Sequence, residues 1–299
     1  MPIRFALALL LTAALLPAAA SAQQDFSAVE ITTVDLGDGL AMLQGAGGNI
    51  GVSAGADGVI LIDDQFAPLT EKIRAAVGKL SDKPIRFVLN THWHSDHTGG
   101  NENLGRAGAL IAAHANVRVR MGSEQFMAAM GRRFPPSPPA ALPVVTYEQG
   151  VVFHLNGHAI RAISVGPAHT DGDSIVHFER ADLIHTGDTY FAEMYPFFDS
   201  SSGGSIDGMI AAADAILELA GPATRIIPGH GPLSDRAGLA AAREMLATVR
   251  QRVSAAIAAG RDRDAVVAAG HTAEFDARFG AGQPAERFVR LVYDSLKGN

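Results

Sequence analysis

The amino-acid sequence predicts an α/β protein built from two similar halves. Short, dense apolar runs bounded by glycine recur along the chain, which is typical of buried strands. Between them lie longer segments whose apolar residues recur at the spacing of one helix face. Loops rich in histidine and aspartate directly follow several of the apolar runs, and an α/β protein usually carries its site at the ends of its strands.

The first half predicts strands and helices in alternation. Apolar runs separated by glycine turns predict strands over 40–43, 49–53 and 58–63. The helical spacing of apolar residues predicts a helix over 68–80. The elements expected after it are strands over 85–89 and 108–113 and a helix over 115–130.

A proline-rich segment, RRFPPSPPAALP, occupies residues 132–143 and contains five prolines. Proline fixes φ and lacks an N–H donor, so the segment cannot form a regular helix or a central strand. We interpret it as a linker between the two halves, because proline-rich segments commonly act as stiff spacers. The alternative is a stiff flap near the site.

The second half repeats the pattern of strands followed by helices. Strands are expected over 150–155, 158–165, 174–179, 183–185 and 225–228. Apolar spacing predicts helices over 206–217, 235–260 and 284–296. We expect these C-terminal helices to belong to one domain that spans residues 23–299.

Residues 1–22 have the features of a secretory signal peptide. Arg4 gives a positive start, residues 5–16 are apolar apart from one threonine, and the ASA sequence at 20–22 fits a cleavage site. The apolar run is shorter than the roughly 20 residues that span a bilayer. We therefore expect cleavage after Ala22 and an exported protein, periplasmic or secreted, without stable membrane insertion.

Composition narrows the chemistry further. The chain contains no cysteine, which excludes disulfides, thiolate ligands and a cysteine nucleophile. The formal net charge is −7 and no lysine- or arginine-rich run occurs, so we expect no nucleic-acid partner, since phosphate binding needs a basic face. With 47% hydrophobic residues, a chain of this length can bury a sufficient core.

The motif THWHSDH, residues 91–97, gathers three histidines and an aspartate. Side chains two residues apart in an extended segment point the same way, so His92 and His94 can converge on one ion. Asp96 and His97 lie further along and can face a second. Imidazole nitrogen and carboxylate oxygen suit a zinc-like ion, and four ligands so close together can hardly all reach one tetrahedral ion. The spacing therefore favours two metals.

Further candidate ligands follow other predicted strands. They are His169 in GPAHTDGD, Asp188 in HTGD, and His230 in PGHG. A glycine near each of them lets the backbone approach the site closely.

The four motifs THWHSDH, GPAHTDGD, HTGDTYF and PGHG, in this order, resemble the metallo-β-lactamase fold superfamily. The resemblance runs from about residue 29 to about residue 232. It implies an αββα sandwich, in which two β-sheets are flanked by helices, with metal ions at one edge between the sheets.

The resemblance also implies a ligand set and two zinc ions as cofactors. The implied ligands are His92, His94 and His169 for the first metal, Asp96, His97 and His230 for the second, and Asp188 as a bridge. Asp63, which ends a predicted strand, is implied to brace the histidine loop, since metal-bound histidines usually need an acceptor behind them. The alternative for Asp63 is a turn residue or helix cap.

A bridging aspartate resembles that of glyoxalase II and the acyl-homoserine lactonases. Two dications can share a water and make it hydroxide near neutral pH, and Asp96 is expected to orient this nucleophile and carry a proton. We expect a β-lactamase-like hydrolase that attacks a lactam or ester carbonyl. The alternatives are a lactonase, a thioesterase of the glyoxalase II type, or a persulfide dioxygenase with a single iron.

Two loops are candidates for contact with a small-molecule substrate. Residues 190–198, YFAEMYPFF, form the densest aromatic stretch of the chain, and such residues commonly wall a pocket. We expect Tyr190 or Tyr195 to contact substrate and Phe197 and Phe198 to lie in the core. The glycine-rich segment 44–49 either folds over the site or is a plain hairpin turn.

Overall fold

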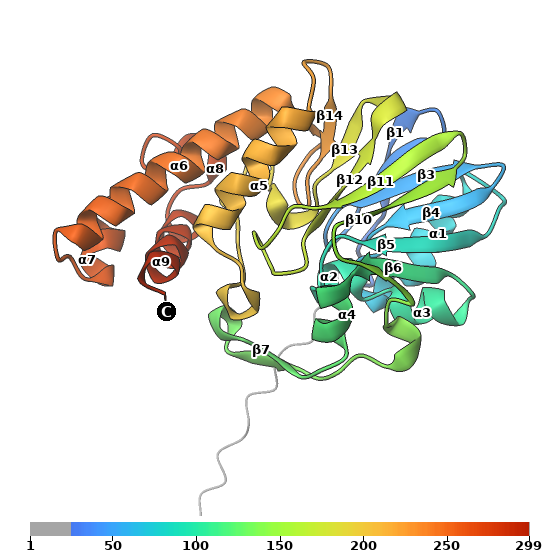
Figure 1. Ribbon diagram of the computed structural model, residues 1–299, viewed down its shortest axis with the longest axis horizontal. Coiled ribbons are helices and arrows are strands. Elements are labelled where there is room, and N and C mark those ends of the chain that lie inside the picture. Colours follow the sequence, from blue (N-terminus) through green and yellow to red (C-terminus); the bar gives the residue numbers. More distant parts are fainter. Residues whose placement is uncertain (1–24, 299) are drawn as a thin grey trace, which may run out of the picture.

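Two β-sheets pack face to face, and helices cover their outer faces (Figure 1). The computed structural model describes residues 25–298, so the predicted signal peptide over 1–22 lies outside the described residues. The αββα arrangement expected from the sequence is confirmed. Among the helices of residues 25–298, none combines the length and the apolar character needed to cross a bilayer.

The first sheet has seven strands in the order β1-β2-β3-β4-β5-β6-β9. Neighbours from β1 to β4 are antiparallel, whereas β4, β5, β6 and β9 run parallel. Parallel strands bring their carboxyl ends to one edge of the sheet, which is where the histidine motif emerges. The strands are β1 (Thr32–Gly37), β2 (Leu40–Gln44), β3 (Ile50–Gly55), β4 (Gly58–Ile62), β5 (Ile85–Asn90), β6 (Leu110–His114) and β9 (Val145–Tyr147).

The second sheet has six strands in the order β10-β11-β12-β13-β14-β15. Its strands are antiparallel except for the pair β13 and β14, which is parallel. Asp188 and His230 therefore follow two neighbouring strands at the same edge. The strands are β10 (Gly150–Leu155), β11 (His158–Ser164), β12 (Ser174–Phe178), β13 (Leu183–His185), β14 (Arg225–Ile227) and β15 (Ser234–Asp235).

The helices occupy both outer layers. Those next to the first sheet are α1 (Thr70–Gly78), α2 (Ser95–Thr98), α3 (Asn101–Arg106) and α4 (Ala115–Met121). Those of the second half are α5 (Ile206–Leu219), α6 (Arg236–Ala258), α7 (Arg263–Ala268), α8 (Asp276–Phe279) and α9 (Gln283–Lys297). Short 3-10 turns are η1 (Ala67–Leu69), η2 (Ala128–Met130), η3 (Pro139–Ala141), η4 (Glu179–Ala181), η5 (Gly187–Thr189) and η6 (Ser200–Ser202).

Local sequence explains where the long helices begin. Ser205 caps α5 by accepting a hydrogen bond from the Gly208 N–H, and Asp235 caps α6 in the same way through the Gly238 N–H. Helix α9 carries Pro284 in its first turn, where a missing N–H costs nothing.

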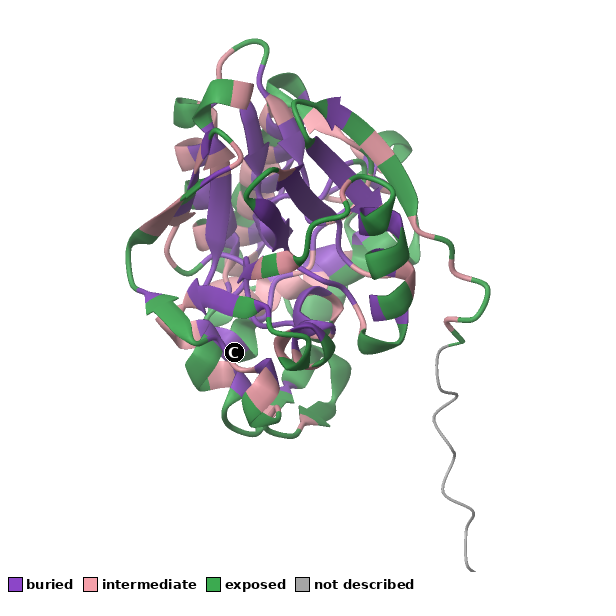
Figure 2. Ribbon diagram, turned by 90° about the vertical axis from the view of Figure 1, so that its right-hand side faces the viewer, coloured by how far each residue is buried: buried purple, intermediate pink, exposed green. Residues whose placement is uncertain are grey.

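Three apolar layers hold the sandwich together, and the central strands of each sheet are largely buried (Figure 2). Between the sheets, Met42 and Ile60 of the first pack with Val176 and Phe178 of the second. Outside the first sheet, α1 and α3 bury their apolar faces. Outside the second, α5, α6 and α9 share one cluster with the sheet, so the C-terminal helices form part of the same packed unit.

The segment between α4 and β9 differs from the sequence prediction. The helix predicted over 115–130 ends at Met121, because Gly122 closes it and the chain turns away. The chain continues as a hairpin of β7 (Gln125–Met127) and β8 (Arg132–Phe134), with Gly131 in the left-handed region at φ 59°. The interpretation of residues 132–143 as a linker between the halves is therefore wrong: β9 still belongs to the first sheet, and the proline-rich segment lies within the first half.

Candidate metal centre

The predicted ligands converge at the edge where the strands of both sheets end. His92 and His94 leave β5 on the loop that leads into α2, and His169 lies on the loop between β11 and β12. Asp188 lies in the η5 turn after β13, and His230 follows β14. The motifs are far apart in the sequence, but the strand order places their loops together.

Two groups of potential ligands form there. The first is His92, His94, His169 and Asp188, and the second is Asp96, His97 and His230; within each group the ligand atoms lie within 4.8 Å of one another. The structure thus brings all seven residues together in the grouping that the resemblance implies.

Asp188 lies between the two groups. Its Oδ1 is 3.0 Å from Nε2 of His97, and its Oδ2 is 3.4 Å from Nε2 of both His169 and His230. A carboxylate that reaches histidines of both groups has the position of a bridging ligand.

The unpaired atoms of the cluster fit metal ions. Within the described residues, Nε2 of His92 and Oδ1 of Asp188 are buried and lack a hydrogen-bond partner; the approach of His97 to Asp188 has ion-pair distance but not hydrogen-bond geometry. A buried polar group without a hydrogen-bond partner lowers the stability of the fold by about 1–3 kcal/mol, so such atoms normally bind a partner such as a metal ion. Imidazoles and carboxylates in this number are the donor set of zinc-like sites.

The imidazole rings are oriented by groups outside the cluster. Nδ1 of His169 donates a hydrogen bond of 2.8 Å to the carbonyl oxygen of Phe197, which leaves its Nε2 facing the centre. Nε2 of His94 lies 3.4 Å from Oδ2 of Asp199, which turns its Nδ1 inward to within 2.8 Å of Nε2 of His169. Such outer partners fix the tautomer and the direction of each ligand atom.

Asp63 holds the histidine loop from below. It is fully buried, and one carboxylate oxygen accepts from the Thr91 N–H at 2.8 Å while the other contacts Nδ1 of His97 at 2.8 Å and the Thr91 hydroxyl at 2.7 Å. Its φ of 66° is rare for a residue with a side chain and marks a backbone held in place by its surroundings. Asp63 therefore has the position of the brace that the resemblance implies.

Sequence reasoning missed two carboxylates that position the ligands. Buried Asp173 accepts hydrogen bonds from the backbone N–H groups of His169 at 2.6 Å and Thr170 at 2.9 Å, which shapes the GPAHTDGD loop. Its place inside that motif was the available signal. Asp199 lies 105 residues from His94, so no local pattern could have paired the two.

Glycines let two loops approach the ligands. A Cβ on Gly48 would meet Cε1 of His97 at 2.1 Å, and a Cβ on Gly229 would meet Oδ1 of Asp188 at 2.1 Å. The glycine-rich tip over 44–49 therefore packs directly against the centre, and its glycines are needed for that contact as well as for the turn.

Electrostatics divides the cluster into two kinds of histidine. Burial opposes the charged form, but nearby carboxylates, Asp188 first, outweigh it, holding the pKa of His97 well above its usual value and raising the pKa of His230 to about 9. In the first group, burial dominates and lowers the pKa of His169 to about 4 and that of His92 well below its usual value. Metal ions bind deprotonated imidazole, so an ion in the second group must displace protons from His97 and His230, whereas His92 and His169 carry none at neutral pH.

A cavity of about 550 Å³ opens onto this centre. Asp96, Asp188 and His230 form part of its floor. Aromatic and aliphatic side chains make most of its walls, and they come from the histidine loop, the β7–β8 hairpin, residues 191–197 and α9. The proline-rich segment begins in this wall, to which it contributes Arg132 and Phe134. This position agrees with the alternative interpretation of the segment as a flap near the site.

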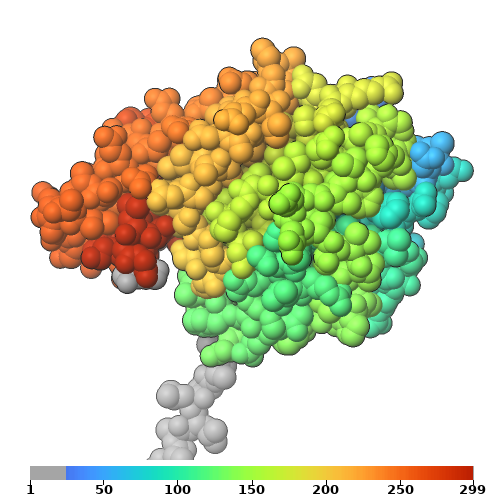
Figure 3. All heavy atoms as spheres, in the orientation of Figure 1, coloured from blue at the N-terminus to red at the C-terminus, as the bar shows by residue number. Residues whose placement is uncertain are grey.

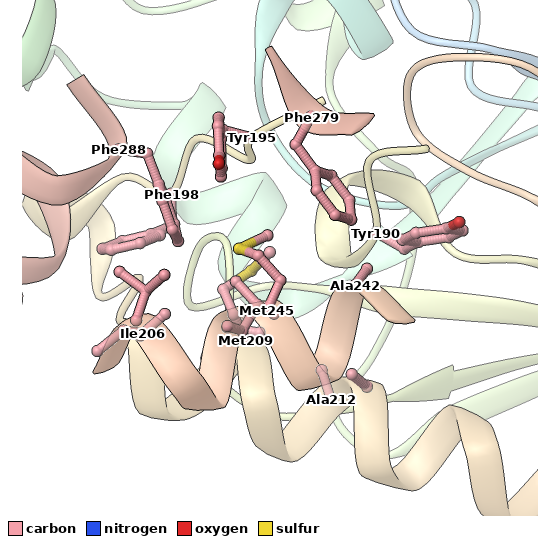
Figure 4. Packing of buried hydrophobic residues seen from close by; sticks show 14 of the residues in the cluster. Tyr190, Tyr195, Phe198, Ile206, Met209, Ala212, Ala242, Met245, Phe279 and Phe288 are labelled. Atoms are coloured by element: carbon pink, nitrogen blue, oxygen red, sulfur yellow. The ribbon is translucent and has the colours of Figure 1, made fainter. Parts of the chain in front are cut away.

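The two tyrosines proposed as substrate contacts differ in position (Figure 4). Tyr195 lines the cavity with its ring, which stacks on Phe288 at 5.1 Å, while its hydroxyl bonds to Asp276 at 2.7 Å. Tyr190 lies in the core beside α6, with its hydroxyl 2.8 Å from that of Ser234, and does not line the cavity. The expected contact for Tyr190 is therefore wrong.

The aromatic stretch contains a second difference from the sequence prediction. Phe197 lines the cavity rather than lying in the core. Phe198, the next residue, is fully buried as expected. Phe191 also lines the cavity, and its ring stacks on His230 at 5.1 Å. Adjacent residues in this loop face opposite ways, which a count of aromatic residues cannot resolve.

A sequence model of the metallo-beta-lactamase superfamily matches residues 44–232. The match covers more than half of the chain and includes all seven candidate ligands. The chain therefore belongs to the metallo-β-lactamase superfamily, whose members bind metal ions and are generally hydrolases.

Individual relatives are more distant. The chain is 27% identical to the lactamase-like protein aptB of Emericella nidulans over 62% of this chain and 50% of that one. It is 31% identical to a hydroxyacylglutathione hydrolase of Methylococcus capsulatus over 36% of this chain and 35% of that one. The chain thus spans half or less of the length of these two relatives. Among solved structures, a metallo-β-lactamase from Pontibacter korlensis superposes with a TM-score of 0.60 at 17% identity, covering 73% of this chain and 99% of that one, which shows the shared fold.

Proposed function

We propose that the chain is an exported, β-lactamase-like hydrolase, periplasmic or secreted, that holds two zinc ions and cleaves a lactam or ester carbonyl. The observation that carries the proposal is the meeting of two ligand groups at Asp188 on the floor of a largely apolar cavity. An apolar pocket with a few convergent polar groups is the usual form of a small-molecule site. Export rests on the signal-peptide features of residues 1–22.

The ligand groups divide the metal-binding task. His92, His94 and His169 would hold one ion, Asp96, His97 and His230 the other, and Asp188 would contact both. Zinc ions bound there would supply a Lewis acid for the carbonyl oxygen and lower the pKa of bound water toward neutrality. The largely apolar walls lower the dielectric constant beside the centre, which strengthens the electrostatic interactions there.

Asp96 has a second task as a carrier of protons. Its side chain is 26% exposed and lines the cavity, and its Oδ2 is 3.3 Å from Nε2 of His230. Burial would raise the pKa of Asp96, but His97 and His230 outweigh burial and lower it to about 2. The carboxylate is therefore ionised at neutral pH and can orient the nucleophile by accepting a hydrogen bond; its place on the cavity floor supports the further role of passing a proton to the leaving group.

A thioesterase of the glyoxalase II type, or a lactonase, is the second candidate. It is favoured by similarity to the hydroxyacylglutathione hydrolases of Methylococcus capsulatus and Gloeobacter violaceus, at 31% and 33% identity. Export weighs against a glutathione thioester, since glutathione is a cytosolic compound.

Metal analysis and a hydrolysis panel together test the proposal. The purified protein should contain about two zinc ions per chain, as its two ligand groups require. It should hydrolyse at least one compound from a panel of lactams, lactones and thioesters, and chelation should abolish the activity. One iron per chain, with no hydrolysis of any compound, would instead favour the single-iron oxygenase.

A further inference from the structure

The outer wall of the cavity is built from two elements on opposite sides of the active-site loops. The β7–β8 hairpin contributes residues from Met127 to Phe134, and α9 contributes residues from Gln283 to Leu291. In Figure 3 the green segment that includes the hairpin and the red C-terminal helix lie on either side of a notch. Helix α9 lies beyond the residues 44–232 that match the superfamily, so this part of the wall is not set by the family match.

Each of these two elements presents an unpaired arginine to the cavity. Of the arginines in the part of the chain that the structure describes, those whose guanidinium group makes neither a hydrogen bond nor an ion pair are Arg132, Arg261, Arg278 and Arg287. Arg132 and Arg287 both line the cavity and are exposed. The guanidinium of Arg132 lies 5.0 Å from the ring centre of Phe134, which keeps it beside the cavity wall.

The neighbouring arginines on the same elements are paired. Arg133, next to Arg132, bonds to Glu124 at 2.7 Å, and Arg290, one turn after Arg287, bonds to Asp264 at 2.9 Å. In both elements the arginine that faces away from the cavity has a carboxylate partner, and the one that lines the cavity has none. A guanidinium left without a partner beside an apolar wall is suited to a carboxylate supplied by a ligand, which it can bind through two parallel hydrogen bonds.

The acidic residues that line the cavity do not pair with these two arginines. Asp96 and Asp188 are its only lining carboxylates among the described residues, and both are engaged with histidines on the floor. Arg287 also borders a second cavity of about 510 Å³, where Arg263 and Arg290 are already paired with Asp294 and Asp264. Arg132 and Arg287 are therefore the two arginines without a side-chain partner that line the first cavity, and Arg287 alone of the two also borders the second.

We propose that the substrate is an amphipathic carboxylate, with an apolar body that fills the cavity and an acid group that Arg132 and Arg287 bind at its rim. The inference rests on the proposed function and names the substrate class of that site. The two arginines are specificity-determining residues: they fix the charged end of the molecule and leave the reactive carbonyl over the floor.

A binding experiment with matched probes tests this inference without any need for turnover. The probes are 4-phenylbutyrate and its neutral amide, 4-phenylbutyramide, titrated calorimetrically into the zinc-loaded protein. The wild-type protein should bind the acid at least about tenfold more tightly than the amide, the order expected for charge-assisted hydrogen bonds. In the double variant Arg132→Gln/Arg287→Gln this preference should fall to about twofold or less, with amide affinity and zinc content unchanged.

The control is Arg261→Gln, which removes an unpaired arginine that does not line the cavity; it should keep the full preference for the acid. A wild-type protein without preference would overturn the inference. So would a preference that survives the double substitution, since the acid would then be bound by the zinc ions alone. Failure of the hydrolysis panel would count against the proposed function only, because the binding ratio is measured independently of hydrolysis.

Discussion

Asp188 is the residue whose removal should separate the two metal sites. In Asp188→Ala the first group keeps three buried imidazoles, whereas the second keeps two imidazoles and the partly exposed Asp96. We expect metal analysis after dialysis to fall from about two zinc ions per chain toward about one, because a zinc site needs three or four good ligands. Equal loss from both groups, or loss from neither, would contradict the bridging assignment.

Asp96 can be tested as a proton carrier apart from its role as a ligand. Asp96→Asn keeps the shape and one coordinating oxygen but cannot accept a proton. We expect turnover to fall at least about a hundredfold, within the range of general acid–base catalysis, and to stay low after excess zinc restores occupancy.

The matched control for this substitution is Asp82→Asn, an exposed aspartate that precedes β5 and does not line the cavity, which should leave turnover unchanged. Recovery of Asp96→Asn to near wild-type turnover on addition of zinc would reduce Asp96 to a ligand only.

The histidine pKa values predict a pH dependence of zinc binding. The pKa of His230 is raised to about 9 in the metal-free protein and that of His97 is also raised, so both carry a proton at pH 7. His169, with a pKa lowered to about 4, does not. Zinc affinity of the second group should therefore increase as pH rises from 7 toward 9, because zinc must displace the protons on His97 and His230.

Proton release provides the measurement for this difference. Calorimetric titration of zinc at pH 7 in two buffers of different ionisation enthalpy counts the protons released per ion. The ion that enters the second group should release more protons than the ion that enters the first. The reverse order would show that the two groups are charged in the opposite way.

The site residues that could be predicted from the sequence are those that carry their own local signal. Each ligand lies within a few residues of a strand end and beside other polar residues of its motif, so periodicity and composition mark it. Asp199, Arg132 and Arg287 have no such signal, because they reach the site only through tertiary packing of segments that are distant in sequence. The prediction that Tyr190 contacts substrate is wrong for the same reason: its loop approaches the site, but its side chain lies in the core.

At the scale of elements, the strands β1, β9 and β15 were not predicted. The predicted strands and long helices lie within a few residues of the observed ones, except in the segment 115–130. Its apolar pattern is real, since Val117, Met121 and Met127 all pack in one cluster with Trp93. They do so from a helix and a strand rather than from one helix, because Gly122 and Gly131 allow the chain to turn twice. Helical spacing and a folded-back hairpin can bury the same positions, and spacing alone does not separate them.

The β7–β8 hairpin contributes an aromatic contact that we expect to affect substrate binding. Phe134 lines the cavity and packs edge-on against Trp93 at 5.9 Å. We expect Phe134→Ala to raise KM roughly three- to tenfold, through loss of aromatic contact area, with zinc content unchanged.

Phe126 is the matched control, because it lies on the partner strand, is 50% exposed and does not line the cavity. Phe126→Ala should leave KM at the wild-type value. Equal increases in KM for both variants would mean that the hairpin acts through its overall stability and not through Phe134.

At the scale of the whole molecule, α9 ties the cavity to the core of the second half. Phe288 is 1% exposed, stacks on Tyr195 and belongs to the cluster shared by α5, α6 and the second sheet. We expect Phe288→Ala to lower the free energy of unfolding by about 3–5 kcal/mol, measured by urea denaturation, as for other large-to-small substitutions in a core.

Val119, which is 66% exposed, provides the contrast: Val119→Ala should change the free energy of unfolding by less than about 0.5 kcal/mol. A small effect of Phe288→Ala would show that α9 only rests on the surface of the second half.

The division between the matched residues 44–232 and α9 also bears on how such a protein can diversify. Every candidate ligand lies in the first part, whereas one side of the cavity is supplied by the second. Mutations on the cavity-facing turns of α9 can therefore accumulate without touching a ligand, as long as its buried residues keep their packing. A duplicated gene could in this way change its substrate through substitutions in α9 while its metal ligands stay the same.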